Sequence, residues 1–267
     1  MKLVSPVRLA VMDWGVGGLS VMNELARRLP KTSMLYFSDS GTTPYGKVPR
    51  AALRARVREV ILSLEREYGT KHVVVACNAA STVLPSLDHE LLQRGIHVMG
   101  VIEPGIALAK KSGCRNLGII GGRRTILSRR FTNALSSRSV KAVGRIAQPL
   151  SALIERGELD SELMLSTLRQ ILRPLRNCDG LLLACTHYAA VKELIGALLP
   201  NCKVLDPAAY TSELVVRAWG RELKAANSAP SMFLTTGDAR AMKHAALKAF
   251  GTRLAKPKTC AIVHATG

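Results

Sequence analysis

The chain of 267 residues is poor in aromatic residues and has no long apolar run. Aromatic side chains make up only 4% of it, too few for the base-stacking platforms of proteins that bind single strands. No segment approaches the roughly 18 consecutive apolar residues that cross a bilayer. The start, Met1–Arg8, lacks the apolar stretch of a signal peptide. We therefore expect a cytoplasmic protein without membrane association.

The six cysteines show no C-x-x-C spacing, which argues against zinc and dithiol redox sites. A reducing cytosol also argues against a disulfide framework. Cys185 and His187 lie two positions apart, but no further ligand cluster accompanies them, so we expect no metal site. A free cysteine is most often a small buried hydrophobe. A function for Cys77 or Cys185 therefore needs evidence beyond the residue type.

Acidic residues are scarce relative to basic ones. The chain has 38 Lys and Arg against 19 Asp and Glu, a formal charge of +19. Such an excess favours association with anions. The basic pairs are spread along the chain and form no recognisable nucleic-acid module. The composition therefore predicts only weak, non-specific association with nucleic acid.

Short β-rich apolar runs alternate with longer amphipathic stretches, which predicts an α/β fold with parallel strands. The length fits one large domain or two smaller ones. The expected strands are Leu9–Met12, Met34–Phe37, Val73–Ala76, Val98–Ile102, Leu117–Ile120 and Leu181–Ala184. The expected helices are Leu19–Leu29, Arg50–Tyr68, Ser81–Arg94, Ile106–Ser112, Ser161–Leu175 and Val191–Leu199.

One pattern recurs at a spacing of 108 positions. Val73–Asn78 and Leu181–Thr186 both consist of a buried strand, Ala, Cys and a small polar residue. The strands Leu9–Met12 and Leu117–Ile120 are separated by the same distance. These two coincident offsets predict two halves with a similar strand order, related by pseudo-twofold symmetry.

Cys77 and Cys185 each follow a predicted strand, where ligands bind in open α/β sheets. A thiol at a helix N-terminus has a lowered pKa, so both thiols are expected to titrate nearer neutrality. Two thiols that face each other can remove a proton from one face of a carbon and return one to the other, which is two-base racemisation or epimerisation. His187 is suited to relay a proton beside Cys185. Asp13 could orient a thiol or cap the following helix.

Two glycine-rich segments fall short of cofactor motifs. Asp13–Gly18 resembles a dinucleotide loop, but Ser20 stands where the third glycine is needed. Gly41–Lys47 resembles a phosphate loop, but Val48 replaces the magnesium-binding Ser or Thr and Pro44 removes an amide. We expect no cofactor.

Several short motifs follow one another over almost the whole chain. They are Asp13–Ser20, Tyr36–Asp39, Pro44–Gly46, Ala76–Ser81, Gly100–Gly105, Thr125–Ser128, Glu155-x-Gly157, Cys185–Tyr188 and Thr235–Asp238. In content and order they resemble the glutamate racemases of the aspartate/glutamate racemase superfamily.

The resemblance implies two flavodoxin-like α/β domains, each a doubly wound parallel sheet, with the active site between them. One domain would comprise residues 1–99 and be completed by 207–267, and the other residues 100–206. The implied activity is cofactor-independent interconversion of L- and D-glutamate, which supplies D-glutamate for peptidoglycan. We expect a small amino-acid substrate and a homodimer.

The resemblance also implies roles for individual residues. Cys77 would take the proton from the D-isomer and Cys185 from the L-isomer. The acidic and imidazole helpers would be Asp13, Asp39, Glu155 and His187. The substrate-binding residues would be Trp14, Pro44, Tyr45, Gly46, Asn78, Ala79, Thr125 and Thr186.

The chain departs from the family pattern at substrate-holding positions. Trp14 stands where Ser is usual, and Ala79 stands where Thr is usual. One lost hydrogen bond to a charged group costs roughly 1.5–3 kcal/mol. Two alternatives therefore stay open beside a glutamate racemase. One is a racemase or isomerase for another acidic or amino-acid substrate, and the other is a basic binding module with weak catalysis.

Overall fold

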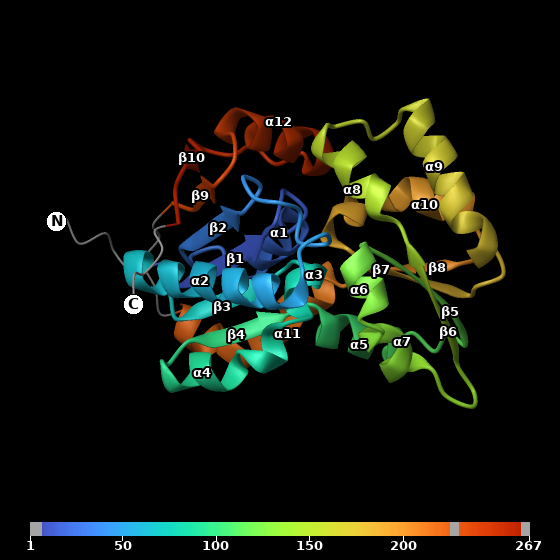
Figure 1. Cartoon of the computed structure of the whole chain (residues 1–267), viewed down its shortest axis with the longest axis horizontal. Helices are drawn as coiled ribbons and strands as arrows, with labels where there is room; N and C mark the ends of the chain where they lie inside the picture. The colour runs from blue at the N-terminus through green and yellow to red at the C-terminus, as the bar shows by residue number, and fades with distance from the viewer. Residues whose placement is uncertain (1–6, 225–229, 263–267) are drawn as a thin grey trace.

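The computed structural model describes residues 7–224 and 230–262, which form two parallel sheets (Figure 1). The first sheet has the order β10-β9-β2-β1-β3-β4. Its strands are β1 (Leu9–Asp13), β2 (Met34–Ser38), β3 (His72–Val75), β4 (His97–Gly100), β9 (Met232–Thr235) and β10 (Lys258–Thr259). The second sheet has the order β6-β5-β7-β8. Its strands are β5 (Asn116–Gly121), β6 (Lys141–Ile146), β7 (Gly180–Ala184) and β8 (Lys203–Leu205).

Helices cover both faces of the first sheet, so its central strands are buried along their whole length and are mostly apolar. Leu9 and Val11 of β1 pack toward one face, while Ala10 and Met12 pack toward the other. The first face carries α1 (Leu19–Arg28), α11 (Ala208–Lys224) and α12 (Ala239–Phe250). The second face carries α2 (Arg50–Tyr68), α3 (Asn78–Ser81) and α4 (Asp88–Gln93).

The second sheet is covered in the same way. One face packs against α8 (Gln148–Glu155), α9 (Glu162–Leu172) and α10 (Lys192–Leu198). The other packs against α5 (Ile102–Lys111) and α7 (Arg130–Leu135). The short helix α6 (Arg123–Leu127) follows β5. The predicted α/β class with two doubly wound parallel sheets is confirmed.

The strand order explains the repeat of 108 positions. Four neighbouring strands of the first sheet have the order β2-β1-β3-β4, and the second sheet has the order β6-β5-β7-β8. In these two orders β1 and β5, which are separated by the repeat spacing, both stand second. The two cysteine-bearing strands, β3 and β7, therefore occupy equivalent places beside β1 and β5. The boundaries at residues 99 and 206 stay a prediction. The strands β9 and β10 join the first sheet from the C-terminal part of the chain.

Three predicted elements differ from the structure. The strand expected over Val98–Ile102 ends at Gly100, and α5 begins at Ile102 instead of Ile106. In place of the helix expected over Ser81–Arg94, α3 ends at Ser81, and a 3-10 turn over Leu84–Ser86 and then α4 follow. Pro85 in that turn cannot donate a backbone hydrogen bond, which is why a continuous helix does not form.

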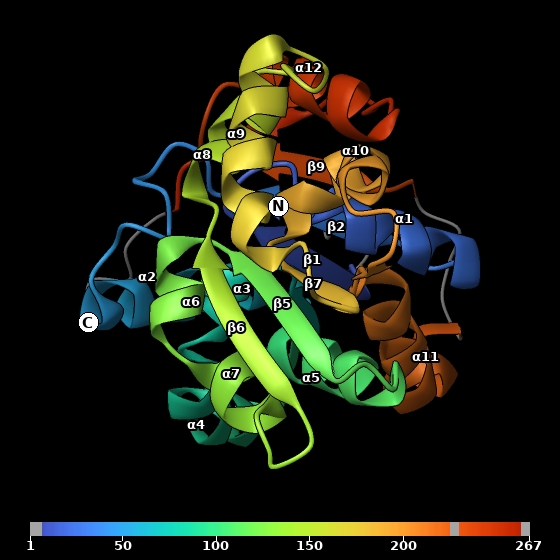
Figure 2. The same cartoon turned by 90° about the vertical axis from the view of Figure 1, so that its right-hand side faces the viewer.

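Four strands have no counterpart among the predicted ones. They are β6, β8, β9 and β10. Figure 2 shows β6 along the outer edge of the second sheet, where its residues are largely exposed. None of the described helices is long and apolar enough to cross a membrane.

Candidate active site

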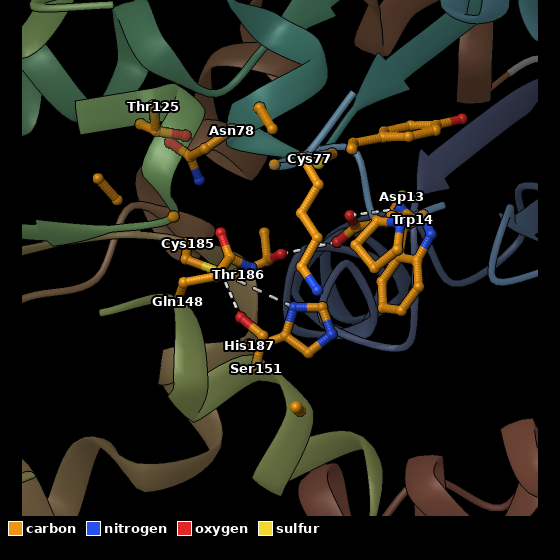
Figure 3. Close-up of a pocket in the computed structure, with 18 of the residues that line it drawn as sticks. Asp13, Trp14, Cys77, Asn78, Thr125, Gln148, Ser151, Cys185, Thr186 and His187 are labelled. Carbon is orange, nitrogen blue, oxygen red and sulfur yellow. Dashed lines mark hydrogen bonds between the residues drawn. The ribbon is translucent and has the colours of Figure 1, made fainter. Parts of the chain in front are cut away.

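A pocket of about 470 Å³ lies where residues at the carboxyl ends of β1, β3 and β7 meet (Figure 3). Both cysteines singled out by the repeat line it, one from each sheet. All other predicted site residues except Asp39 line it too: Asp13, Trp14, Pro44, Tyr45, Gly46, Asn78, Ala79, Thr125, Glu155, Thr186 and His187.

Cys77 lies between β3 and α3 and is buried beside Asp13. The Asp13 side chain is in hydrogen-bonding contact with the thiol, and it also accepts a bond of 2.7 Å from the Thr186 hydroxyl. Burial, and then the charge of Asp13, raise the pKa of Cys77 well above its ordinary value. Burial raises the pKa of Asp13 as well. The first thiol therefore has a desolvated carboxyl group as its partner.

Cys185 follows β7 and has different neighbours. Its sulfur lies 3.8 Å from Nδ1 of His187 and 3.5 Å from Oγ of Ser151. Nε2 of the same imidazole is 2.5 Å from Oε1 of Glu155. Burial alone would lower the pKa of His187, but the bonds to Cys185 and Glu155 outweigh it and raise that pKa well above its ordinary value. The second thiol thus has a protonated imidazole as its partner.

The expected lowering of thiol pKa by a helix N-terminus is wrong for Cys77. The helix α3 that follows it has only four residues, and a 3-10 turn over Thr186–Val191 follows Cys185. So short a helix aligns few backbone dipoles. Burial and the neighbouring carboxylate therefore decide the pKa of Cys77. Asp13 does not cap α1, whose N-cap residue is Gly18.

The two sides of the pocket are joined by hydrogen bonds. Asp13 accepts from Thr186, and Glu155 accepts from the backbone amide of Val16 at 2.7 Å. The loop has no room for a side chain at position 17: a Cβ on Gly17 would lie 2.6 Å from Nδ1 of His187 and 2.6 Å from Oγ1 of Thr186. Glycine at 17 lets the backbone of the loop after β1 lie against these two residues, which follow β7.

The sequence and the fold of the chain were compared with those of known proteins. Residues 9–215 match the family model described as Asp/Glu/Hydantoin racemase. The chain belongs to this family. The match confirms the resemblance read from the motifs and the prediction of an amino-acid racemase.

Individual relatives agree with the family over most of their length. The glutamate racemase of Thermus thermophilus is 37% identical over 240 residues, which cover 88% of this chain and 89% of the relative. The crystal structure of that species' glutamate racemase with β-chloro-D-alanine has a TM-score of 0.83 at 34% identity, covering 96% and 98% of the two chains. Glutamate racemase isoform RacE1 of Bacillus anthracis has a TM-score of 0.85 at 29% identity, covering 97% and 98%.

Within this racemase-family pocket, Asn78 presents a polar atom without a protein partner. Its Oδ1 is buried, and no hydrogen-bond donor among the described residues reaches it. A buried acceptor left without a partner costs about 1–3 kcal/mol. A ligand that donates a hydrogen bond at this place, such as an ammonium group, would remove that cost.

Asp39 does not line the pocket, unlike the other predicted helpers. Its buried carboxylate accepts a bond of 2.6 Å from the Tyr45 hydroxyl and two bonds from Arg56, at 2.7 and 2.8 Å. The hydroxyl of Thr236 reaches it too, at 2.9 Å. These partners occupy both carboxylate oxygens. Asp39 therefore holds the segment around Tyr45 in place, and its role as a catalytic helper stays a prediction.

Trp14 forms part of the pocket wall. Its indole Nε1 donates to the carbonyl oxygen of Thr42 at 2.9 Å, which fixes the ring. Figure 3 shows the ring beside Asp13, away from the line between Cys77 and Cys185. The indole thus leaves the space between the two thiols open.

Several lining residues were not among the predicted site residues. They are Lys47, Gly122, Gln148, Pro149, Ser151, Ala152 and Ala184. Gln148 and Ser151 belong to α8, which follows the unpredicted strand β6. The alternation of more and less exposed residues in Lys141–Ile146 is typical of an edge strand. Gln148 follows the carboxyl end of that strand, so this signal could have indicated it as a site residue. In the described ranges, no group of three or more His, Cys, Asp or Glu side chains is placed to hold a metal ion.

Proposed function

We propose that this protein is a cofactor-independent glutamate racemase in which Cys77 and Cys185 are the two bases. One observation carries the proposal: two thiols, which follow equivalent strands of the two sheets, line the same pocket. The names of its relatives supply glutamate as the substrate. D-Glutamate formed in this way would supply peptidoglycan synthesis.

The proposed reaction moves one proton through each thiol. Starting from L-glutamate, the Cys185 thiolate takes the proton from Cα, and the electron pair of the broken C–H bond stays on the substrate. The Cys77 thiol then delivers its own proton to the opposite face, which forms D-glutamate. Cys185 ends as a thiol and Cys77 as a thiolate, so one proton must return between them before the next turnover.

The helpers are placed to assist each transfer. His187, held by Glu155, is in contact with the sulfur of Cys185 and can orient it. Asp13, from a different position of the repeat, lies beside Cys77. General acid–base groups positioned in this way contribute typically about 10²–10⁴-fold to a rate.

The polar groups of the pocket provide contacts for an amino acid. The unpartnered Oδ1 of Asn78 suits the substrate's ammonium group. Thr186, Tyr45 and Gly46 line the same space and are proposed to hold the two carboxylates. Thr125 lies on the wall contributed by the second sheet.

Exchange of each thiol tests the mechanism. We expect Cys77→Ser and Cys185→Ser each to lower both inversion and solvent-deuterium incorporation at Cα of glutamate by at least about 10²-fold. Polarimetry follows the inversion, and mass spectrometry follows the label. The matched control is Cys114→Ser, which changes a cysteine outside the pocket and should leave both rates unchanged. Unimpaired turnover in both pocket variants would refute the proposal.

A racemase of the same family acting on a different acidic or amino-acid substrate is the second candidate. It is favoured by the placement of Trp14 and Ala79 on the pocket wall, because both depart from the family pattern. On this hypothesis the double variant Trp14→Ser, Ala79→Thr gains glutamate turnover, while the wild type exchanges the α-proton of another amino acid faster. No gain in the double variant would argue against it. A homodimer and weak nucleic-acid association stay predictions.

A further inference from the structure

Ser151 places a buried hydroxyl beside the sulfur of Cys185, and the reaction described above gives it no role. It belongs to α8, and its Oγ lies 3.5 Å from Sγ of Cys185 (Figure 3). Only 8% of the residue is exposed. Glu155, which holds the imidazole of His187, stands four positions further along the same helix. One face of α8 therefore meets both the thiol and its imidazole partner.

The hydroxyl of Tyr188 lies against the same pair. It is in hydrogen-bonding contact with Ser151 and with Cys185. Its own proton is already engaged, because it donates to the carbonyl oxygen of Ala147 at 2.7 Å. Burial, and then the charge of Cys185, raise the pKa of Tyr188 well above its ordinary value, so the phenol keeps that proton. Toward Ser151 and Cys185, the Tyr188 oxygen therefore acts as an acceptor.

The proton of the Ser151 hydroxyl is free to turn between two acceptors. A serine in a helix often donates to the carbonyl four residues earlier, which here is that of Ala147. That oxygen already accepts from the amide of Leu150 at 3.1 Å and from Tyr188, which uses both of its lone pairs. The two acceptors in contact with Ser151 are Sγ of Cys185 and the oxygen of Tyr188.

The imidazole on the other side of the sulfur acts as a donor. The pKa of His187 is raised despite its burial, so both ring nitrogens carry protons. Nε2 faces Glu155 and Nδ1 faces Cys185. A doubly protonated ring has no lone pair for a thiol proton. A thiol at position 185 therefore needs a hydroxyl oxygen as its acceptor, whereas a thiolate is stabilised by both donors.

We propose that Ser151 is a positioning residue whose hydroxyl serves both protonation states of Cys185. With the thiolate, the Ser151 hydroxyl donates to the sulfur. With the thiol, the sulfur donates to Oγ of Ser151, and the hydroxyl turns to donate to Tyr188. Only hydrogen bonds are exchanged, and both hydroxyls keep their protons. The inference rests on the proposed function, in which Cys185 alternates between these two states.

Ser151→Ala tests the thiolate state. The thiolate loses a charge-assisted donor, so the pH midpoint for alkylation of Cys185 by iodoacetamide should rise by about one unit, which is about tenfold less thiolate below the midpoint. Mass spectrometry of the Cys185 peptide measures the rate. The matched control is Ser166→Ala in α9, which removes an exposed hydroxyl that donates to a backbone carbonyl. Its midpoint should equal that of the wild type.

Tyr188→Phe tests the thiol state, because it removes the acceptor and keeps the buried ring. The thiol is destabilised while the thiolate keeps both donors, so the midpoint for Cys185 should fall by about half a unit to one unit. The control Tyr210→Phe changes a tyrosine of α11 outside the pocket. Opposite shifts in the two pocket variants distinguish a hydroxyl that serves both states from a general loss of packing.

Other titratable groups also face Cys185. They are His187 of the same turn, Glu155 behind the imidazole, and Cys77 across the pocket. All of them are unchanged in Ser151→Ala and in Tyr188→Phe, so the shifts report the hydroxyls.

Turnover provides the second measurement. In Ser151→Ala, kcat/KM for L-glutamate should fall about tenfold at pH 7 and should approach the wild-type value as pH rises through the new midpoint. An unmoved midpoint, an equal shift in Ser166→Ala, or shifts of the same direction in both pocket variants would overturn the inference. A moved midpoint with unchanged kcat/KM would overturn the role in turnover.

Cys185→Ser separates this inference from the proposed function. If that variant loses turnover while the midpoint of Ser151→Ala stays at the wild-type value, the inference alone fails. If Cys185→Ser keeps full turnover, the role of Cys185 as a base fails, whatever the alkylation midpoints show.

Discussion

The Cys77 and Cys185 sides of the pocket share a backbone plan but differ in chemistry. Each cysteine follows the equivalent strand of its sheet. At the repeat spacing of 108 positions, His187 corresponds to Ala79, and Asp13 at the end of β1 corresponds to Gly121 at the end of β5. Each half therefore lacks the helper that the other half has.

This difference shows that the fold repeats the position of the thiol without repeating its environment. The carboxyl group beside Cys77 carries negative charge when ionised, and it disfavours a second negative charge on the sulfur. The imidazole beside Cys185 is held protonated by Glu155 and by the sulfur itself. The two thiols therefore meet different partners, a carboxyl group at Cys77 and an imidazole with a raised pKa at Cys185.

The largest expected effect is from removing one helper at a time. We expect His187→Gln to lower kcat/KM by about 10²–10⁴-fold. L- and D-glutamate have equal free energies, so kcat/KM must fall equally in both directions. The asymmetry should appear in the primary isotope effects: α-deuterated L-glutamate should give the larger effect, because proton transfer at Cys185 becomes rate-limiting.

The matched variant is Asp13→Asn, which should give the opposite pattern, with the larger isotope effect on α-deuterated D-glutamate. The same pattern in both variants would show that the two helpers do not serve separate thiols.

A smaller loss is expected from Gly17→Ala. The added methyl group would meet Nδ1 of His187 and Oγ1 of Thr186, while neither Cys77 nor Asn78 is among its closest neighbours. Misplacement by about 1 Å can cost about 10²-fold in rate, and the isotope pattern should follow that of His187→Gln. The control is Gly196→Ala in α10, where a Cβ meets nothing within 4 Å. Its turnover should equal that of the wild type.

The pH dependence of alkylation distinguishes the two thiols further. Because the pKa of Cys77 is raised, its reaction with iodoacetamide should have a midpoint above the ordinary value of about 8.5. Asp13→Asn removes a charge that opposes the thiolate, so the midpoint should move to lower pH. Mass spectrometry of the Cys77 peptide measures the rate, and Asp160→Asn, an exposed carboxylate, is the control. A midpoint unmoved by Asp13→Asn would contradict the assigned pairing.

The smallest expected effect is on stability. The pKa of Asp13 is higher in the folded state than in the unfolded state. The contribution of Asp13 to the free energy of unfolding is therefore complete below its unfolded-state pKa and is lost as pH rises through its folded-state pKa. Asp13→Asn cannot ionise, so the variant does not lose this stability at higher pH. Its Tm should exceed that of the wild type at pH 7, by about 2–4 °C for each kcal/mol, and the difference should shrink toward pH 4. Calorimetry across this range measures it, and a difference independent of pH would contradict the burial cost.

The buried strands and the two thiols could be predicted because their signals are local. Continuous apolar runs such as Val73–Ala76 indicate strands covered on both faces, and the following cysteine marks the carboxyl end. The edge strand β6 was missed because its exposed, partly charged residues and Gly144 give no such run. Gln148 and Ser151, which follow β6, were missed with it.

Asp39 shows a different limit of local reasoning. Its motif Tyr36–Asp39 resembles the family pattern, but nothing in the sequence indicates that Arg56 and Thr236 would occupy its oxygens. These partners lie 17 and 197 positions away along the chain.

By itself, the sequence determined the strand-and-helix alternation, the repeat and the two cysteines at strand ends, because these depend on neighbouring residues and on the burial of whole strands. Only the tertiary structure decided which charged group each thiol meets. The bonds of Asp13 to Thr186 and of Glu155 to Val16 join residues 173 and 139 positions apart. Burial and electrostatic interaction depend on such distances in space, so the pKa of Cys77 rises where a helix N-terminus alone would have lowered it.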